Sequence, residues 1–184
     1  TCNMKKLMLP DFFQASEVPI VHKFYRNYFK DCYVCGDVDY IFGPNTAFFD
    51  HCEIHSIARV SEGKAYITAA STPAGQEFGL VFSHCRITGE EPDSVYLGRP
   101  WRDCAKTAFI CCELGDHICP EGWQNWGKVR AEVLSDYIEY GNFGPGADCS
   151  GRSPLSRCLV NPEVETYFSK ENVLVGEDGW IPAE

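Results

Sequence analysis

One spacing recurs four times in this chain and restricts its fold more than any other feature. A phenylalanine is followed by a cysteine three positions later and by an aliphatic residue two positions after that. The four segments are Phe29-x-x-Cys32-x-Val34, Phe49-x-x-Cys52-x-Ile54, Phe82-x-x-Cys85-x-Ile87 and Phe109-x-x-Cys112-x-Leu114. The cysteines are 20, 33 and 27 residues apart. Recurrence at roughly 20–30 residues, with one set of strands per repeat, is typical of a solenoid.

The step from each cysteine to the aliphatic residue has the period of two of a β-strand. We therefore predict an all-β chain wound into a parallel β-helix, in which equivalent residues stack into interior ladders of phenylalanine and of cysteine. A β-sandwich, whose strands also recur at short intervals, is the alternative. Asn161-Pro162-Glu163 predicts the start of a short helix that runs to about Ser169, within a C-terminal tail of turn-rich loops.

Length and charge restrict the remaining possibilities. The 184 residues suffice for a single domain over 1–184 with a substantial core. A net charge of −10 argues against nucleic acid, because phosphate binding requires a basic surface. No apolar run approaches the roughly 20 residues that cross a bilayer, so we predict no membrane-spanning segment. The sequence does not indicate an oligomeric state.

Cysteine usage leaves two interpretations. The chain has eleven cysteines, so at least one is unpaired or bonded to another chain. Four of them occupy the repeat positions, which resemble core sites, and a free cysteine in a core behaves as a small hydrophobe. This favours buried free thiols, and a framework of disulfide bridges is the alternative.

Two segments carry residues with the potential for chemistry. Segment 36–43 contains Asp39, and segment 97–101 contains Arg99 and Trp101. In an extended strand, positions i and i+2 share a face, so Arg99 and Trp101 should point to the same side. A carboxylate, a cation to hold it and a ring to stack on a sugar are the parts of a polysaccharide-processing site.

Each group of candidate metal ligands in the sequence is too small to form a metal site. Asp37 and Asp39 share a strand face by parity, but Ca²⁺ takes about six to eight oxygen ligands and no further acidic cluster is near in sequence. His51 and His55, and the pair Cys32-x-x-Cys35, each lack the second half of a zinc site. We therefore expect no metal and no cofactor.

Several motifs together resemble one family. They are segments 36–43, 66–69, 96–101, 120–126, 139–146 and 179–182. Asp-Tyr-Ile-Phe-Gly and Leu-Gly-Arg-Pro-Trp within them are similar to motifs of the pectinesterases, or pectin methylesterases, which are right-handed parallel β-helices. The resemblance implies a secreted, cofactor-free carboxylic ester hydrolase of pectin degradation and cell wall modification. It would act on methylesterified homogalacturonan and release pectate and methanol.

The resemblance also implies roles for individual residues. Asp39 would be the nucleophile that attacks the methyl ester and forms an acyl-enzyme, and Arg99 would pair with it and hold it. Trp101 would stack on a galacturonate ring, and Phe42 would line the same cleft. For Trp123 and Trp126 we favour a structural role over contact with substrate.

The chain departs from the family at its N-terminal side. The match covers the later part of the catalytic domain, so early coils are expected to be absent and 1–24 reads as a divergent stretch. The family's Gln-Asp-Thr-Leu segment supplies a general acid/base aspartate and an oxyanion-stabilising glutamine. Aligned without gaps, Val18 falls at that aspartate, and a one-residue insertion would place Glu17 there as a substitute acid/base. The alternative is that Phe13-x-x-Ser16-x-Val18 is another, degenerate repeat and that the catalytic loop is deleted.

Three functions therefore remain. The first is a pectinesterase. The second is a truncated or degenerate member that acts at most as a non-catalytic pectin-binding β-helix. The third is another pectin-active β-helix, a lyase or a polygalacturonase, against which the Leu-Gly-Arg-Pro-Trp motif speaks.

Overall fold

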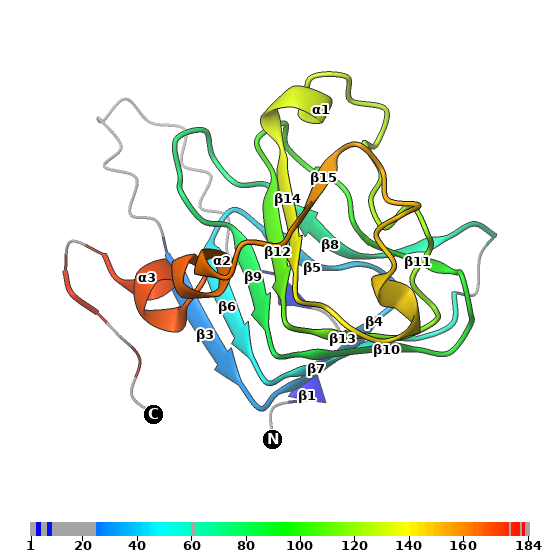
Figure 1. Ribbon diagram of the computed structural model, residues 1–184, viewed down its shortest axis with the longest axis horizontal. Coiled ribbons are helices and arrows are strands. Elements are labelled where there is room, and N and C mark those ends of the chain that lie inside the picture. Colours follow the sequence, from blue (N-terminus) through cyan, green and yellow to red (C-terminus); the bar gives the residue numbers. More distant parts are fainter. Residues whose placement is uncertain are drawn as a thin grey trace.

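The strands form three parallel sheets that the chain visits in turn, which confirms the predicted parallel β-helix (Figure 1). The computed structural model describes residues 3–4, 7–8, 25–59, 62–176, 178–180 and 182. One sheet contains, in spatial order, β1 (Asn3–Met4), β4 (Tyr33–Gly36), β7 (Glu53–Ser56), β10 (Arg86–Gly89) and β13 (Glu113–Leu114).

The second sheet contains, in the same sense, β2 (Leu7–Met8), β5 (Val38–Gly43), β8 (Ala65–Ala70) and β11 (Val95–Gly98). The third contains β3 (Arg26–Lys30), β6 (Thr46–Asp50), β9 (Leu80–Ser83), β12 (Lys106–Ile110), β14 (Asp136–Tyr140) and β15 (Ser156–Leu159). The helical segments are α1 (Ala131–Leu134), η1 (Pro145–Ala147), α2 (Glu163–Tyr167) and α3 (Lys170–Leu174).

The recurring spacing produces the predicted interior ladders. Phe29, Phe49, Phe82 and Phe109 are in register across β3, β6, β9 and β12. Their rings stack with centroid separations of 4.8, 4.6 and 4.5 Å. These values are close to the ~4.8 Å between neighbouring strands, so each ring rests on the ring of the coil before it.

The repeat cysteines form a second ladder, in which Cys52, Cys85 and Cys112 are free thiols, the state that the sequence favoured. The Sγ atoms of Cys52, Cys85 and Cys112 donate to the carbonyl oxygens of Phe29, Phe49 and Phe82 in the preceding coil, at 3.3–3.5 Å. Burial raises the pKa of the Cys85 thiol well above its usual range, so it stays protonated and inert. Among the described cysteines, one disulfide joins Cys149 to Cys158 near the C-terminal side.

The turn that precedes each repeat cysteine is left-handed. Asp31, His51, His84 and Cys111 have φ angles of 51°, 51°, 53° and 53°. Each turns the chain from the six-stranded sheet into the five-stranded sheet, and the next coil uses Gly141 with φ 63°. Side chains at this corner therefore stack outside the helix, one coil above another.

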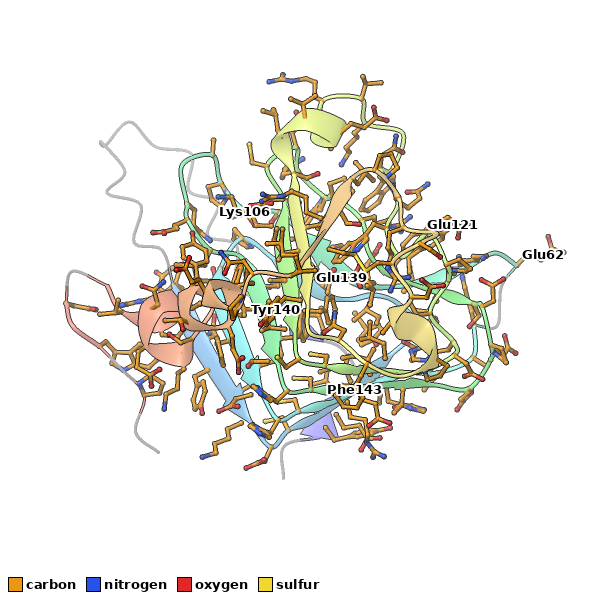
Figure 2. All side chains as sticks on the ribbon, viewed as in Figure 1. Glu62, Lys106, Glu121, Glu139, Tyr140 and Phe143 are labelled. Atoms are coloured by element: carbon orange, nitrogen blue, oxygen red, sulfur yellow. A yellow bond between two sulfur atoms is a disulfide. The ribbon has the colours of Figure 1, made fainter. Side chains whose placement is uncertain are left out.

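At the C-terminal end of the phenylalanine ladder, a charged residue occupies the next equivalent position. Glu139 of β14 is in register with Phe109, and its carboxylate accepts from the indole Nε1 of Trp123 at 2.9 Å. Arg152 pairs with Glu139 in a salt bridge whose side chains are only 4% and 2% exposed. Glu139 and the next residue, Tyr140, leave β14 on opposite sides (Figure 2). The ion pair is thus part of the interior.

Helices α2 and α3 lie beside the outer face of the six-stranded sheet (Figure 1). Val173 and Leu174 of α3 are buried in a second apolar cluster with Phe48 and Val81 of that sheet. The predicted helix is found at its expected start, where the Asn161 side chain accepts from the Glu163 N–H at 3.0 Å. It ends earlier than predicted because Ser169 caps a separate helix, α3.

Within the described residues, none of the helices combines the length and the apolar character that crossing a bilayer requires.

Candidate functional site

The site lies on the four-stranded sheet and is built from three successive coils. Asp39 belongs to β5, Tyr66 to the neighbouring β8, and Arg99 directly follows β11. Two strand spacings separate the backbones of Asp39 and Arg99, which is about 10 Å. Only a long side chain spans that gap, and the arginine does so by crossing over β8.

A bulge in β5 sets the direction of Asp39. The pairing of β5 with β8 shifts register between Val38 and Ile41, and Asp39 has a left-handed φ of 48°. Tyr40 and Ile41 are consequently both buried, whereas a regular strand would bury only one of two neighbours. The regular alternation of faces along the strand is therefore interrupted at the bulge. The expectation that Asp37 and Asp39 share a face rested on that alternation and loses its basis. Asp37 is exposed and accepts from the Val38 N–H.

Asp39 and Arg99 form a two-point ion pair across 60 residues of sequence. Arg99 Nε donates to Asp39 Oδ1 at 2.9 Å, and Arg99 Nη2 donates to Oδ2 at 2.6 Å. The side chains of Asp39 and Arg99 are 20% and 16% exposed, so the pair is partly shielded from water. Bidentate geometry fixes both position and orientation of the carboxylate.

Two aromatic rings hold the guanidinium from its faces. The Arg99 Cζ lies 3.8 Å from the ring centroid of Tyr66 and 3.8 Å from that of Trp126. Guanidinium stacking on aromatic faces is favourable because the faces carry partial negative charge. Arg99 is thus held by a carboxylate and two rings.

The contacts of Tyr66 and Trp126 with Arg99 were not predicted from the sequence, where Trp126 was expected to have a structural role. The position of Tyr66 depends on register, because Tyr66 pairs with Tyr96 of β11 and the centroids of their stacked rings are 5.2 Å apart. An aromatic residue at the same position in consecutive strands was the available signal. Trp123, in contrast, is buried, in agreement with the structural role favoured for it.

Trp101 and Phe42 meet beside the ion pair. Their rings form an edge contact with a centroid distance of 5.7 Å. The N–H groups of Arg99 and Trp101 donate to Thr68 O and Ala70 O of β8, so 99–101 continues the strand pattern. Arg99 and Trp101 are two positions apart in this extended segment and both donate toward β8, so their side chains lie on the same face, as expected.

Lys128 stabilises the segment 99–101 through hydrogen bonds to its backbone. Its Nζ donates to Pro100 O at 2.8 Å and to Trp101 O at 2.7 Å, and it lies 4.8 Å from the Trp126 ring centroid. Burial lowers the pKa of Lys128, and the nearby cations Arg102 and Arg99 lower it further.

The structure brings Asp39 and Arg99 together, and places Trp101 against Phe42. Glu17 lies outside the described residues. The geometry offers a fixed carboxylate beside a cation and two partly buried rings, which suits nucleophilic attack on a carbonyl carbon and stacking against a sugar.

Metal-ligand clusters occur elsewhere among the described residues. Potential ligands gather at His84, Cys111 and Glu165, and at Glu139, Cys149 and Cys158. The second group includes the two half-cystines, so its sulfur atoms are bonded to each other. Neither group contains Asp39 or Arg99.

Comparisons with known proteins agree on one family. The model of the Pectinesterase family matches residues 14–177. Pectinesterase 31 of Arabidopsis thaliana is 40% identical over 140 residues, which cover 75% of this chain and 43% of that protein. Pectinesterase 2 of Olea europaea is 36% identical over 145 residues, which cover 78% of this chain and 38% of that protein.

Solved structures give the same result. The pectin methylesterase from carrot superposes with a TM-score of 0.76 at 30% identity, covering 86% of this chain and 52% of that one. A pectin methylesterase in complex with hexasaccharide VII superposes with a TM-score of 0.68 at 28% identity, covering 85% of this chain and 53% of that one. The chain thus spans about half, or less, of the length of these relatives.

Proposed function

Because this chain belongs to the pectinesterase family, we propose that it hydrolyses the methyl esters of homogalacturonan to pectate and methanol. The observation that carries the proposal is the bidentate contact between Asp39 and Arg99, which joins the two motifs of the chain that are most similar to the family. A relative that binds a hexasaccharide supports an oligosaccharide as the ligand.

In the proposed reaction, Asp39 is the nucleophile. One carboxylate oxygen attacks the ester carbonyl carbon, and the carbonyl π electrons move to its oxygen. Collapse of the tetrahedral intermediate breaks the bond to the methoxy group, which leaves as methanol after receiving a proton from an acid. Water then cleaves the resulting anhydride, which returns Asp39 and leaves a galacturonate carboxylate.

Arg99 positions the nucleophile. Its two N–H donors fix both carboxylate oxygens, so one lone pair can be aimed at the ester carbon while the rings of Tyr66 and Trp126 prevent the guanidinium from turning. Such preorganisation lowers the barrier because geometry is set before the reaction begins.

Trp101 and Phe42 are the proposed sugar contacts. Both rings are partly buried and lie edge to face beside the ion pair. A flat ring offers apolar area to the C–H face of a galacturonate unit without requiring a charge. With a net charge of −10, the chain should bind the neutral esterified polymer better than its anionic product.

In this proposal the protein is secreted, needs no cofactor and modifies pectin in the cell wall. Its test is methanol release from highly esterified pectin. Asp39→Asn should abolish release while the protein remains folded, because the amide is a much poorer nucleophile than the carboxylate. Asp37→Asn is the matched control, since Asp37 is exposed and its carboxylate accepts a hydrogen bond from the Val38 backbone N–H. Release by Asp39→Asn at the original rate would remove Asp39 from the mechanism.

Glu17 is the proposed acid that protonates methanol. Glu17→Gln should lower the rate of methanol release without weakening pectin binding, because only proton transfer is lost. An unchanged rate would exclude Glu17 from the reaction.

The alternative function is pectin binding without turnover, and a gap-free alignment, which places Val18 at the family's aspartate, favours it. The two functions separate in one pair of measurements on the unsubstituted chain. Retarded migration through a pectin-containing gel together with methanol release supports the esterase, whereas retardation without methanol supports the binding protein.

A further inference from the structure

A group of three unlike metal ligands gathers at a corner of the helix that the proposed reaction does not use. His84 follows β9, Cys111 follows β12, and Glu165 belongs to α2. One ligand atom from each residue lies within 4.8 Å of the other two. His84 Nε2 is 3.7 Å from Glu165 Oε1.

The left-handed corner explains why two of these ligands are adjacent. His84 and Cys111 occupy the same position in consecutive coils, with φ angles of 53° each. Equivalent corner residues stack at about one strand spacing, ~4.8 Å. His51, one coil earlier, stacks on His84 with ring centroids 5.2 Å apart, which limits the rotation of the His84 ring.

Helix α2 supplies the third ligand from a defined position. Val164 and Phe168 pack against the same apolar cluster on the outer face of the six-stranded sheet that Cys111 contacts. Glu165 lies between them in sequence and projects to the corner, where its carboxylate is close to His84. Packing therefore sets the approach of the carboxylate.

The contacts of His84 leave one nitrogen suited to a metal. Its Nδ1 is 2.9 Å from Ser83 Oγ, and its Nε2 faces Glu165. If Nδ1 carries the proton and donates it to Ser83, the lone pair is on Nε2. Metal-bound histidines commonly donate their second N–H to an oxygen in this way.

The ligand chemistry selects the metal. A thiolate, an imidazole and a carboxylate are the three ligand types of zinc sites, and a thiolate does not suit Ca²⁺ or Mg²⁺. Donor atoms around tetrahedral zinc are about 3.5 Å apart, so a separation at the 4.8 Å limit of the group needs to shorten by about 1 Å, whereas His84 and Glu165 are already close to that spacing. The side chains of His84 and Glu165 are 43% and 53% exposed, which gives them room to move and gives an ion access.

We propose that His84, Cys111 and Glu165 form a zinc site that fastens α2 to the corner of the β-helix, with water as the fourth ligand. The ion would join two coils and the C-terminal segment at one point. The site is independent of ester hydrolysis, since none of its ligands contacts Asp39 or Arg99.

Titration with Co²⁺ tests the site, because a cobalt–thiolate bond adds a near-ultraviolet charge-transfer band that other ligands do not produce. The chelator-treated protein, with its Cys149–Cys158 disulfide left intact, should bind one Co²⁺ per chain with this band, and Zn²⁺ should displace it. Cys111→Ser should remove the band. His84→Gln and Glu165→Gln should each weaken binding at least about tenfold, and Ser83→Ala about tenfold through loss of the supporting hydrogen bond.

Matched controls separate this site from other thiols and acids. Cys104→Ser changes another half-buried free cysteine, and Glu163→Gln changes another acid of α2. Both should bind Co²⁺ as the unsubstituted chain does. Zn²⁺ should also raise the Tm of the unsubstituted chain, and the rise should disappear in His84→Gln.

The zinc site is wrong if the unsubstituted chain binds no stoichiometric Co²⁺, or if the band persists in Cys111→Ser. Should Cys111→Ser fail to fold, the exposed His84→Gln variant decides, and undiminished binding by it overturns the proposal. Loss of the band in Cys104→Ser with retention in Cys111→Ser would place the metal elsewhere.

Discussion

At the scale of single residues, Arg99 has the most contacts that bear on function. It donates twice to Asp39 and lies between the rings of Tyr66 and Trp126, at 3.8 Å from each ring centroid. Each of these contacts depends on the planar, delocalised guanidinium. A lysine ammonium carries the same charge but can neither bond two oxygens in parallel nor stack.

Arg99→Lys should therefore lower kcat/KM for methanol release by about ten- to hundredfold, the loss expected when a hydrogen-bonded charge pair becomes misaligned. Arg130→Lys is the control, since Arg130 is 80% exposed and meets Asp103 only at 3.5 Å. Initial rates on esterified pectin measure both. Equal rates for Arg99→Lys and the unsubstituted chain would mean that the two parallel hydrogen bonds of the guanidinium do not contribute to the rate of methanol release.

His117 is a second residue with a measurable consequence. It is 1% exposed, and neither ring nitrogen has a hydrogen-bond partner among the described residues. Its ring fits against Gly89 and Gly115, where a Cβ would come within 2.5 and 2.7 Å. Burial lowers the pKa of His117 from 6.5 to about 4, opposed by the Asp116 carboxylate and assisted by His55.

This pKa gives stability a defined pH dependence. Between pH 6.5 and about 4 the unfolded chain binds a proton at His117 that the folded chain does not. The free energy of unfolding contributed by this residue is therefore present above pH 6.5 and falls by roughly 2–3 kcal/mol as the pH drops to 4. Urea unfolding at a series of pH values measures the slope. His117→Phe keeps a ring in the space and should flatten the curve, and an identical curve for both proteins would contradict the assignment.

At the scale of elements, the ladders decide which strands pair. Each phenylalanine ring rests on the equivalent ring of the neighbouring strand, and each cysteine thiol donates to the carbonyl of that phenylalanine. A slip of one residue would turn every ring out of the interior. The ladders thus set register across β3, β6, β9 and β12.

Removal of one ring from the middle of the stack tests this. Phe82→Ala should lower the free energy of unfolding by about 3–5 kcal/mol, because Phe82 is fully buried between two other rings. Phe143→Ala removes an identical side chain that is 57% exposed and should change stability by less than about 0.5 kcal/mol. Chemical denaturation of both variants makes the comparison, and similar losses would argue against the ladder as a source of stability.

At the scale of the whole molecule, the interior of the helix changes character from one side to the other. Phenylalanine occupies the ladder position up to Phe109, and Glu139 occupies the next one, paired with Arg152. Arg152 also donates to the carbonyl oxygens of Cys119, Pro120 and Gly146. The buried charges therefore bind together loops that the apolar ladder does not reach.

Glu139→Gln should lower the free energy of unfolding by about 3–5 kcal/mol, because it leaves the Arg152 charge buried without its counterion. Glu53→Gln breaks an exposed pair with Arg86 and should alter stability by at most about 1 kcal/mol. In Glu139→Gln/Arg152→Met, the combined loss should be smaller than the sum of the two single losses, and strict additivity in denaturant unfolding would contradict coupling of the pair.

Much of this protein followed from sequence alone, because a solenoid repeats the same local environment in each coil. The spacing from Phe29 to Leu114 predicted the coil lengths and the ladders, and it favoured buried thiols over bridges at the repeat cysteines. The motifs around Asp39 and Arg99 correctly suggested that the two residues meet. The coil lengths and the ladders need only strand periodicity and the tendency of like residues to stack, whereas the pairing of Arg99 with Asp39 was implied by the resemblance to the pectinesterases.

Tertiary structure decided what periodicity cannot express. The β5 bulge broke the parity that linked Asp37 to Asp39, and the stacking of Tyr66 and Trp126 on Arg99 depends on how coils superpose. The repeat relates His84 to Cys111, 27 positions later, but no motif spacing relates either residue to Glu165, which lies 54 positions after Cys111. The physical reason is that sequence patterns record the local period of a strand, whereas lateral neighbours are set by the length of every intervening loop.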